Sequence, residues 1–293
     1  MQSDILCSLN ENNLSGTESD NYICSNKNSG EGLVARILAI VNQKGGVGKT
    51  TTSVNLAASL VAAKRKVLLV DLDPQGNATM GSGVDKRALQ RTVYHALVSS
   101  QCITDIRITT TSGKYDLIPA NRDLAGAEIE MVGLQRREMR LKDSLEKIKN
   151  EYDFILLDCP PALSLLTLNG LCAASAVMIP MQCEYYALEG LSDLVNTIKR
   201  VRANLNPVLE IEGLLRTMYD PRSALTRQVS DQLRDHFGAK VYRTVIPRNV
   251  RLAEAPSFGK PGLYHDRLSK GSQAYLALAG EILNRSSAKV PPI

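Results

Sequence analysis

The stretch that decides the fold of this chain is Lys44-Gly45-Gly46-Val47-Gly48-Lys49-Thr50-Thr51. A short continuous apolar run, residues 37–41 (ILAIV), precedes it, and residues 50–63 follow it with apolar side chains at helical spacing. The apolar run predicts a buried parallel strand, and the spacing after the loop predicts a helix. A strand, a glycine-rich turn and a helix in this order are the context that a phosphate-binding loop requires.

Each residue type in this loop suits a phosphate group. The glycines let backbone N–H groups approach phosphate oxygens with no Cβ in the way, and the helix N-terminus adds the positive end of its dipole. Lys49 supplies a positive charge for the terminal phosphates, and the hydroxyl of Thr50 is a ligand for Mg²⁺. We therefore expect the nucleotide-binding residues of the loop to be Gly45, Gly46, Val47, Gly48, Lys49, Thr50 and Thr51.

The loop departs from the usual spacing at its start. The pattern G-x-x-x-x-G-K-[ST] would place a glycine at position 43, where this sequence has Gln43, and the loop carries an additional lysine, Lys44. The alternative is a plain glycine turn between a strand and a helix, with two surface lysines. The agreement of strand, loop and helix favours the phosphate-binding loop.

Two carboxylates follow the next apolar run, residues 67–70 (VLLV). Ligands bind at the carboxyl ends of parallel strands, and side chains at i and i+2 of an extended segment point the same way. Asp73 is therefore placed to orient a water that attacks the γ-phosphate, and Asp71 to support the Mg²⁺ shell. The alternative is that Asp73 only starts a turn before Pro74.

A third carboxylate, Asp158, ends the apolar run at residues 154–157 (FILL). Four apolar residues followed by an aspartate fit the Walker B arrangement, in which the acid reaches Mg²⁺ directly or through a water. Other chemistries lack support. The six cysteines include no C-x-x-C pair, the three histidines are scattered, and no G-x-S-x-G motif is present.

The rest of the chain alternates between apolar runs and helical patterns. Strands are predicted at residues 37–41, 67–70, 116–119, 154–157, 176–181, 211–218 and 241–246. Helices are predicted at residues 50–63, 136–149, 187–204, 224–236 and 272–284. This alternation argues for an α/β fold, a mostly parallel twisted sheet flanked by helices on both faces. We expect a flexible N-terminal extension at residues 1–35, one domain at 36–285 and a short C-terminal tail at 286–293.

Composition and charge limit the class of protein and its partners. The 293 residues, 44% hydrophobic and 22% charged, are enough for a large α/β domain. The net charge of +5 is unevenly spread: residues 1–35 carry five acids against Lys27, whereas residues 199–251 carry eleven Lys and Arg against five acids. The basic region suggests an anionic partner, and solvated helix faces are the alternative. No signal peptide or long apolar run is visible, so we expect a cytoplasmic protein with no membrane partner.

Taken together, these motifs resemble the ParA/Soj family of partition ATPases, which are P-loop NTPases of the deviant Walker A class that also contains MinD. The resemblance covers residues 36–285. It rests on residues 44–51, 71–79 (DLDPQGNAT), 158–161 (DCPP), 182–191 (QCEYYALEGL) and 247–261 (PRNVRLAEAPSFGKP).

The resemblance implies a nucleotide cycle with ATP and Mg²⁺ as cofactors. ATP binding closes a sandwich homodimer, in which Lys44 reaches across to the phosphates of the partner subunit. The dimer binds double-stranded DNA without sequence preference, which would make the protein nucleoid-associated. A ParB-type centromere-binding partner stimulates hydrolysis and releases the dimer from DNA.

The resemblance also implies roles for single residues. Lys44, Lys49 and Asp73 are the expected catalytic residues, and Thr50, Asp71 and Asp158 are the expected metal site. The residues implied to border the adenine are Pro247, Arg248 and Asn249. The residues implied to contact DNA are Arg222 and Arg251, which both fall in the basic region.

Two other functions stay open at this point. A MinD-like membrane-positioning ATPase would carry a basic amphipathic helix at its C-terminus, whereas residues 284–293 are short and contain two prolines. A ParA-like ATPase that positions another large cellular assembly would share the nucleotide site, and only Arg222 and Arg251 separate it from a DNA-segregation ATPase. The first 35 residues exceed what chromosomal Soj-like members usually carry, and their role is open.

Overall fold

The computed structural model of this protein describes residues 35–185 and 187–287. The extension predicted at residues 1–35 therefore lies outside the described residues, apart from Ala35. Of the tail predicted at residues 286–293, the backbone of the first two residues belongs to the last helix, and the others lie outside the described part.

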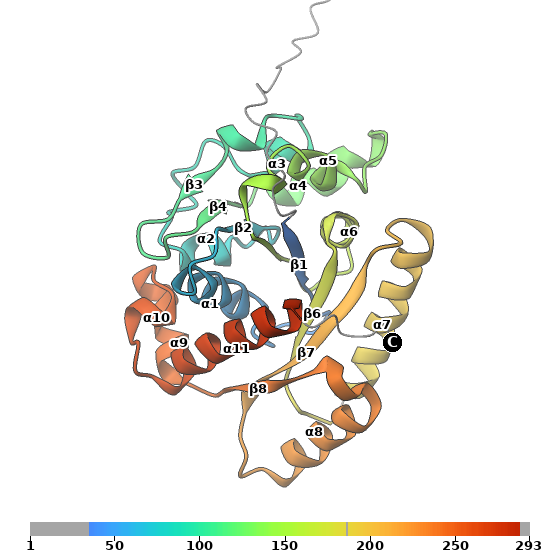
Figure 1. Ribbon diagram of the computed structural model, residues 1–293. Coiled ribbons are helices and arrows are strands. Elements are labelled where there is room, and N and C mark those ends of the chain that lie inside the picture. The colour runs from blue at the N-terminus through green and yellow to red at the C-terminus, as the bar shows by residue number, and fades with distance from the viewer. Residues whose placement is uncertain (1–34, 186, 288–293) are drawn as a thin grey trace, which may run out of the picture.

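Within the described residues, eight strands form one sheet in the order β3-β4-β2-β5-β1-β6-β7-β8. The strands are β1 Arg36–Ile40, β2 Val67–Asp71, β3 Ile108–Thr109, β4 Asp116–Ile118, β5 Phe154–Asp158, β6 Ala176–Met181, β7 Glu210–Tyr219 and β8 Val241–Pro247. All neighbours in the sheet are parallel except β3 and β4. This confirms the predicted α/β fold with a mostly parallel sheet (Figure 1).

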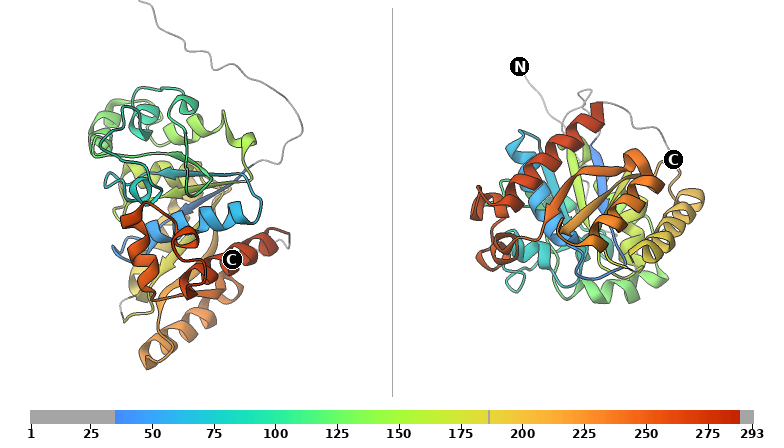
Figure 2. Two further views of the ribbon diagram at one scale, coloured as in Figure 1. Left: turned by 90° about the vertical axis from the view of Figure 1, so that its left-hand side faces the viewer. Right: turned by 90° about the horizontal axis from the view of Figure 1, so that it is seen from below.

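Helices cover both faces of the sheet. The α-helices are α1 Lys49–Ala62, α2 Asn77–Gly81, α3 Val93–Leu97, α4 Leu124–Glu130, α5 Arg140–Leu145, α6 Leu165–Ala173, α7 Ala187–Asn204, α8 Ala224–Phe237, α9 Val250–Glu254, α10 Gly262–His265 and α11 Lys270–Ser287. Figure 1 shows α1, α9, α10 and α11 on one side of the strands and α6, α7 and α8 on the other. Helix α11 packs along β8 and against α1, as a second direction of view also shows (Figure 2).

Alternate residues of each central strand enter different cores. Leu38 and Ile40 of β1 pack with α1 and α11, whereas Ala39 packs with the helices of the opposite face. Residues that alternate in direction along a strand can be apolar throughout only when both faces are covered. The continuous apolar runs of the sequence therefore follow directly from helices on both sides.

All seven predicted strands are present, with no end shifted by more than one residue, whereas the predicted helix at residues 136–149 is shortened. Helix α5 begins only at Arg140, and Arg136 has a φ of 52°, which excludes it from a right-handed helix. Strand β3 and six helices, α2, α3, α4, α6, α9 and α10, were not predicted, and five of these helices have only four to seven residues. Strand β3 has only two residues, and α6 is buried almost all round, which leaves no polar face to mark a helical period.

The order of the central strands places the phosphate-binding loop beside the acidic segments. Strand β5 lies between β1 and β2, and the register pairs Asp158 with Ile40 on one side and with Asp71 on the other. Because these strands are parallel, their carboxyl ends meet at one edge of the sheet. The loop after β1 and both aspartates therefore share one site.

Candidate nucleotide-binding site

The loop between β1 and α1 has the backbone conformation that its glycines predict. Gly46 has a φ of 73° and Gly48 a φ of 86°, both in the left-handed region that glycine tolerates without strain. A Cβ placed on Gly45 or Gly46 would meet no atom within 4 Å, so open space lies above the loop. Below it, the hydroxyl of Thr217 donates a hydrogen bond of 2.7 Å to the carbonyl oxygen of Val47 and fixes the loop against β7.

Lys49 lies at the first position of α1 with its side chain folded back under the loop. Only 7% of the residue is exposed, and its Nζ donates to the carbonyl oxygen of Lys44 at 3.2 Å. Burial lowers the pKa of Lys49, and the nearby carboxylates of Asp158 and Asp73 offset part of that effect. The Lys49 ammonium group thus has one hydrogen-bond acceptor among the described residues, and it lies beneath a glycine loop that faces open space. This arrangement can bind an anion.

Lys44 has a different environment from Lys49. Its Nζ forms an ion pair with the carboxylate of Glu184, and the two side chains are 50% and 51% exposed. Its backbone N–H donates to Asn42 Oδ1 at 2.9 Å, which fixes the start of the loop. Because an exposed ion pair contributes only about 0–1 kcal/mol, Lys44 can exchange this partner for another anion.

Asp158 has the features of a cation ligand. It is fully buried, Ser53 donates to its Oδ1 at 2.8 Å, and Oδ2 has no hydrogen-bond partner among the described residues. Burial raises the pKa of Asp158 to about 8, and the neighbouring Asp71 contributes, whereas hydrogen bonds from Thr50 and Ser53 oppose the shift. A buried carboxylate with an unsatisfied oxygen beside the Thr50 hydroxyl fits the oxygen ligands that Mg²⁺ requires.

Unlike Asp158, Asp71 has hydrogen-bond partners for both of its carboxylate oxygens. Its Oδ2 accepts from the backbone N–H and the hydroxyl of Thr79 at 2.8 and 2.7 Å, and its Oδ1 accepts from the N–H of Asp73 at 3.1 Å. Burial raises its pKa to about 6, and these hydrogen bonds oppose the rise. Asp71 therefore offers no free oxygen, and its place beside Asp158 on the neighbouring strand fits a supporting role in a metal shell.

Asp73 begins a turn and also faces the site. Its Oδ1 accepts from the N–H of Gln75 at 2.9 Å, which is the turn geometry expected before Pro74. Its charge nevertheless acts on Lys49, so its carboxylate lies near the end of the phosphate-binding loop. The turn and the proposed water-orienting role are compatible, because the turn fixes the carboxylate at the carboxyl end of β2.

A cavity of about 170 Å³ adjoins the loop on the side of β8. Its lining includes Gly48 and Thr51 of the loop region together with Pro247, Arg248 and Asn249. The oxygen of Asn249 accepts from the N–H of Leu252 at 3.2 Å and caps α9, which fixes this wall. The structure thus brings the three residues expected at the adenine next to the phosphate-binding loop.

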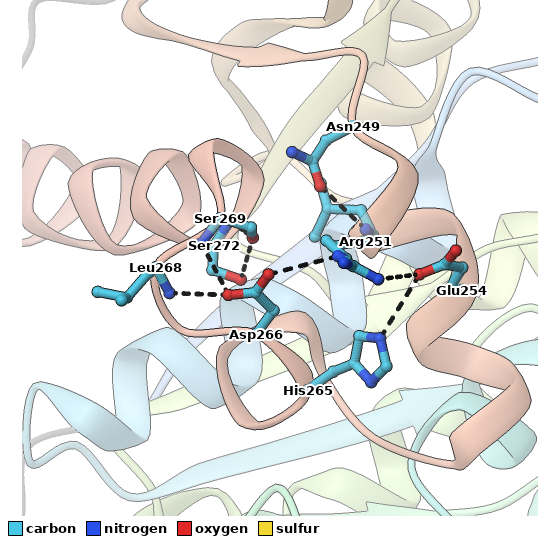
Figure 3. Close-up of polar contacts among 9 residues, drawn as sticks. Asn249, Arg251, Glu254, His265, Asp266, Leu268, Ser269 and Ser272 are labelled. Carbon is cyan, nitrogen blue, oxygen red and sulfur yellow. Dashed lines mark hydrogen bonds and ion pairs between the residues drawn. The ribbon is translucent and has the colours of Figure 1, made fainter.

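The two arginines expected to contact DNA follow the carboxyl ends of β7 and β8. Arg222 is 89% exposed and forms two hydrogen bonds of 3.0 Å with Asp220, which lower the pKa of that carboxyl to about 2. Arg251 is 56% exposed and lies between Glu254 at 3.0 Å and Asp266 at 3.5 Å (Figure 3). Both arginines therefore have local acidic partners that a polyanion would have to displace.

Comparison with known proteins gives the family of this site. The sequence model of a family described as "AAA domain" matches residues 35–211. The sporulation initiation inhibitor protein Soj of Bacillus subtilis is 55% identical over 249 residues, 85% of this chain and 98% of Soj. The chromosome partitioning protein ParA of Myxococcus xanthus is 51% identical over 262 residues, 89% of this chain and 93% of that protein. This chain belongs to the ParA/Soj family of partition ATPases.

A solved structure supports the same fold. Cobyrinic acid a,c-diamide synthase from Mycobacterium smegmatis, crystallised with a bound ATP analog and magnesium, is 38% identical and superimposes with a TM-score of 0.77. The match covers 89% of this chain and all of that one. The sequence identity to that protein is thus lower than the 51% and 55% found with ParA and Soj. Among the described residues, no helix of this ParA/Soj member is long and apolar enough to cross a membrane.

Several residues of the site were not singled out from the sequence. Thr79 holds Asp71, Thr217 holds the loop, and Glu184 pairs with Lys44. Thr79 and Glu184 do lie within two of the stretches that carry the family resemblance, residues 71–79 and 182–191. No local pattern marks Thr217, because its contact with Val47 joins residues 170 positions apart.

Proposed function

We propose that this ParA/Soj member binds ATP and Mg²⁺ at the loop after β1 and hydrolyses ATP to switch its binding of DNA. The observation that carries the proposal is the meeting of an open glycine loop, a buried lysine and a buried, partly unsatisfied carboxylate at one edge of the sheet. A gel shift with non-specific duplex DNA, with ATP and with ADP, tests it. We expect the protein to shift the DNA in the presence of ATP and not in the presence of ADP.

Each residue of the site has a stated task in this proposal. The loop N–H groups and Lys49 bind the phosphates, while Thr50 and Asp158 hold the metal ion and Asp71 supports the metal shell. Mg²⁺, when bound, neutralises charge that develops on the phosphates. Asp73 orients the attacking water, and Pro247, Arg248 and Asn249 border the adenine.

Lys44 is proposed to act across a dimer interface. Within the described part of the chain, the half-exposed Nζ of Lys44 is bound only to Glu184, and it lies at the loop's entrance rather than beneath it. In the proposed ATP-bound homodimer, Lys44 leaves Glu184 and contacts the phosphates of the partner subunit.

Replacing Lys44 with alanine is expected to weaken ATP-induced dimerisation much more than ATP binding by the monomer. The reason is that Lys49, not Lys44, lies beneath the loop of its own subunit. Sedimentation with ATP measures dimerisation, and a fluorescent ATP analogue measures binding at concentrations that keep the protein monomeric. Equal losses in both measurements would place Lys44 in its own subunit's site, and no loss in either would leave it a solvated lysine.

The DNA surface is proposed to include Arg222 and Arg251. Both follow neighbouring parallel strands, so both lie at the same edge of the sheet as the nucleotide site. Not all of the basic region is available: Arg216 is buried and donates to Ser230 Oγ at 2.8 Å, and Lys240 is also buried. These two buried side chains are therefore excluded from the proposed DNA surface, whereas Arg222 and Arg251 are exposed.

Changing Arg222 or Arg251 to alanine is expected to weaken DNA binding by about 10- to 100-fold near 0.1 M salt while ATP-induced dimerisation persists. A dimer presents each arginine twice, so each variant should lower the salt-dependence slope by about two. Binding titrations at two salt concentrations on two unrelated duplexes measure this. Arg87→Ala is the matched control, because Arg87 is 83% exposed and also pairs with a nearby aspartate, Asp85.

The DNA titrations also separate the candidate functions. Unchanged affinity and slope in both variants would remove the DNA role from these residues and favour the positioning of another large assembly.

If the protein binds DNA as proposed, we propose that a ParB-type partner stimulates its hydrolysis of ATP. We also propose that the protein is cytoplasmic and nucleoid-associated. We propose residues 36–285 as the ATPase domain, flanked by an extension at 1–35 and a tail at 286–293.

A further inference from the structure

A second, larger cavity lies away from the nucleotide site. Its volume is about 970 Å³, and it is a groove between the end of α8, the first half of β8 and the last turns of α11. Strand β8 begins at Val241, one of the lining residues, so the groove reaches the amino end of that strand. The phosphate-binding loop follows the carboxyl end of β1, at the opposite edge of the sheet.

Basic side chains dominate the charge of this groove. Three arginines, Arg234, Arg243 and Arg285, line it together with one acid, Glu281. The carboxylate of Glu281 is neutralised and hydrogen-bonded within the groove wall. It accepts from Arg285 at 2.9 Å and from two backbone N–H groups of β8. The groove therefore presents a positive surface.

Arg243 and Arg234 are the arginines most available to a ligand. The residue Arg243 is exposed, and no hydrogen bond or ion pair of its side chain occurs among the described residues. Arg234 has a weak contact of 3.5 Å with Asp231. Arg285 is more firmly held, since it also lies 4.1 Å over the ring of Tyr242.

The edge of the sheet in this groove is closed to strand pairing. Strand β8 is the last strand of the sheet, and an exposed edge normally offers its N–H groups to another strand. Here Glu281 accepts the N–H groups of Arg243 and Thr244 at 2.8 and 2.9 Å. An occupant of the groove would thus be recognised by its charge and not by main-chain pairing.

The N-terminal segment of the chain joins the fold next to this groove. Arg36, the first residue of β1, forms an ion pair with Glu212 of β7. The carbonyl oxygen of Glu212 in turn accepts from Arg285 in the groove wall at 3.4 Å. Strands β1 and β8 are three places apart in the sheet, roughly 14 Å, which about five extended residues can span.

We propose that residues 1–34 of this chain dock in the groove lined by Arg234, Arg243 and Arg285. This segment carries five acids, Asp4, Glu11, Glu18, Asp20 and Glu31, against one basic residue, Lys27. Exposed ion pairs are individually weak and are screened by salt. Because the segment is tethered beside the groove, its effective concentration is of millimolar order, and weak contacts are enough to keep the groove occupied.

Trypsin cleavage of the full chain tests the proposal, because Lys27 is the only lysine or arginine before Arg36. Docking should slow cleavage after Lys27, which mass spectrometry of the intact protein follows. In about 50 mM salt, Arg234→Glu/Arg243→Glu is expected to be cleaved about fivefold faster than wild type, and the difference should vanish near 0.5 M salt. The control Arg87→Glu/Arg136→Glu makes the same charge change at exposed arginines outside the groove and should behave as wild type.

A second variant controls for the possibility that the arginine substitutions alter the structure of the groove. Glu11→Gln/Glu18→Gln/Asp20→Asn changes only the segment and should accelerate cleavage to a similar extent. Equal cleavage of wild type and both test variants would overturn the proposal. Protection that grows with protein concentration would also overturn it, since the occupant would then be a second copy. ATP hydrolysis should stay unchanged throughout, which keeps this test separate from that of the nucleotide site.

Discussion

Replacing Lys49 with alanine is expected to abolish ATP-dependent behaviour, with a loss of at least about 10²-fold in hydrolysis rate. Lys49 is the one lysine beneath the loop, and its ammonium group is held by a single carbonyl contact to Lys44 among the described residues. Phosphate charge in the loop would be left without its compensating cation. Steady-state ATP hydrolysis and binding of a fluorescent ATP analogue measure the loss.

The same variant should fold normally, which makes the result interpretable. Burial lowers the pKa of Lys49, so the charged side chain is held at some cost to the folded protein, and its removal lifts that cost. Thermal unfolding without nucleotide should therefore change little, while the stabilisation by added ATP should disappear. Near-normal hydrolysis in this variant would refute the assignment of the phosphate-binding loop.

The strands and the loop were predictable because local patterns determine them. Residues 44–51 need glycine in the left-handed region at Gly46 and Gly48, and the sequence has glycine at both positions. Buried central strands must be apolar on both faces, so the runs at 37–41 and 154–157 mark them clearly. The placement of Asp71 beside Asp158 followed only once parallel strands were assumed, since the two residues are far apart in the sequence.

The remaining parts of the site depend on contacts that no local pattern records. Thr217 reaches the loop from β7, and Glu184 reaches Lys44 from the segment after β6. The positions of Arg222 and Arg251 could be named from the resemblance, and Asp220 and Glu254 could be named as their local acidic partners, whereas the ion pair of Arg251 with Asp266 could not. The groove beside β8 was invisible in the sequence, because its arginines come from three separate elements.

Replacing Asp73 is expected to separate ATP binding from ATP hydrolysis. Asp73→Ala should bind ATP with nearly normal affinity and hydrolyse it about 10²-fold or more slowly, so that the ATP-bound dimer accumulates. The reason is that the loop, Lys49 and Asp158 all remain, while the carboxylate that orients the water is lost. Size exclusion with ATP should show the dimer, and phosphate release should be nearly absent.

The turn that Asp73 begins offers a sharper version of this experiment. Its Oδ1 accepts the N–H of Gln75, and an asparagine oxygen can accept the same hydrogen bond. Asp73→Asn should therefore keep the turn and remove only the negative charge. If Asp73 acts in hydrolysis, both variants lose phosphate release and both accumulate the dimer. If it serves only the turn, Asp73→Asn hydrolyses ATP normally while Asp73→Ala loses stability. An Asp73→Ala variant that stays monomeric with ATP, under conditions in which the wild type dimerises, would mean that its carboxylate serves dimer formation instead.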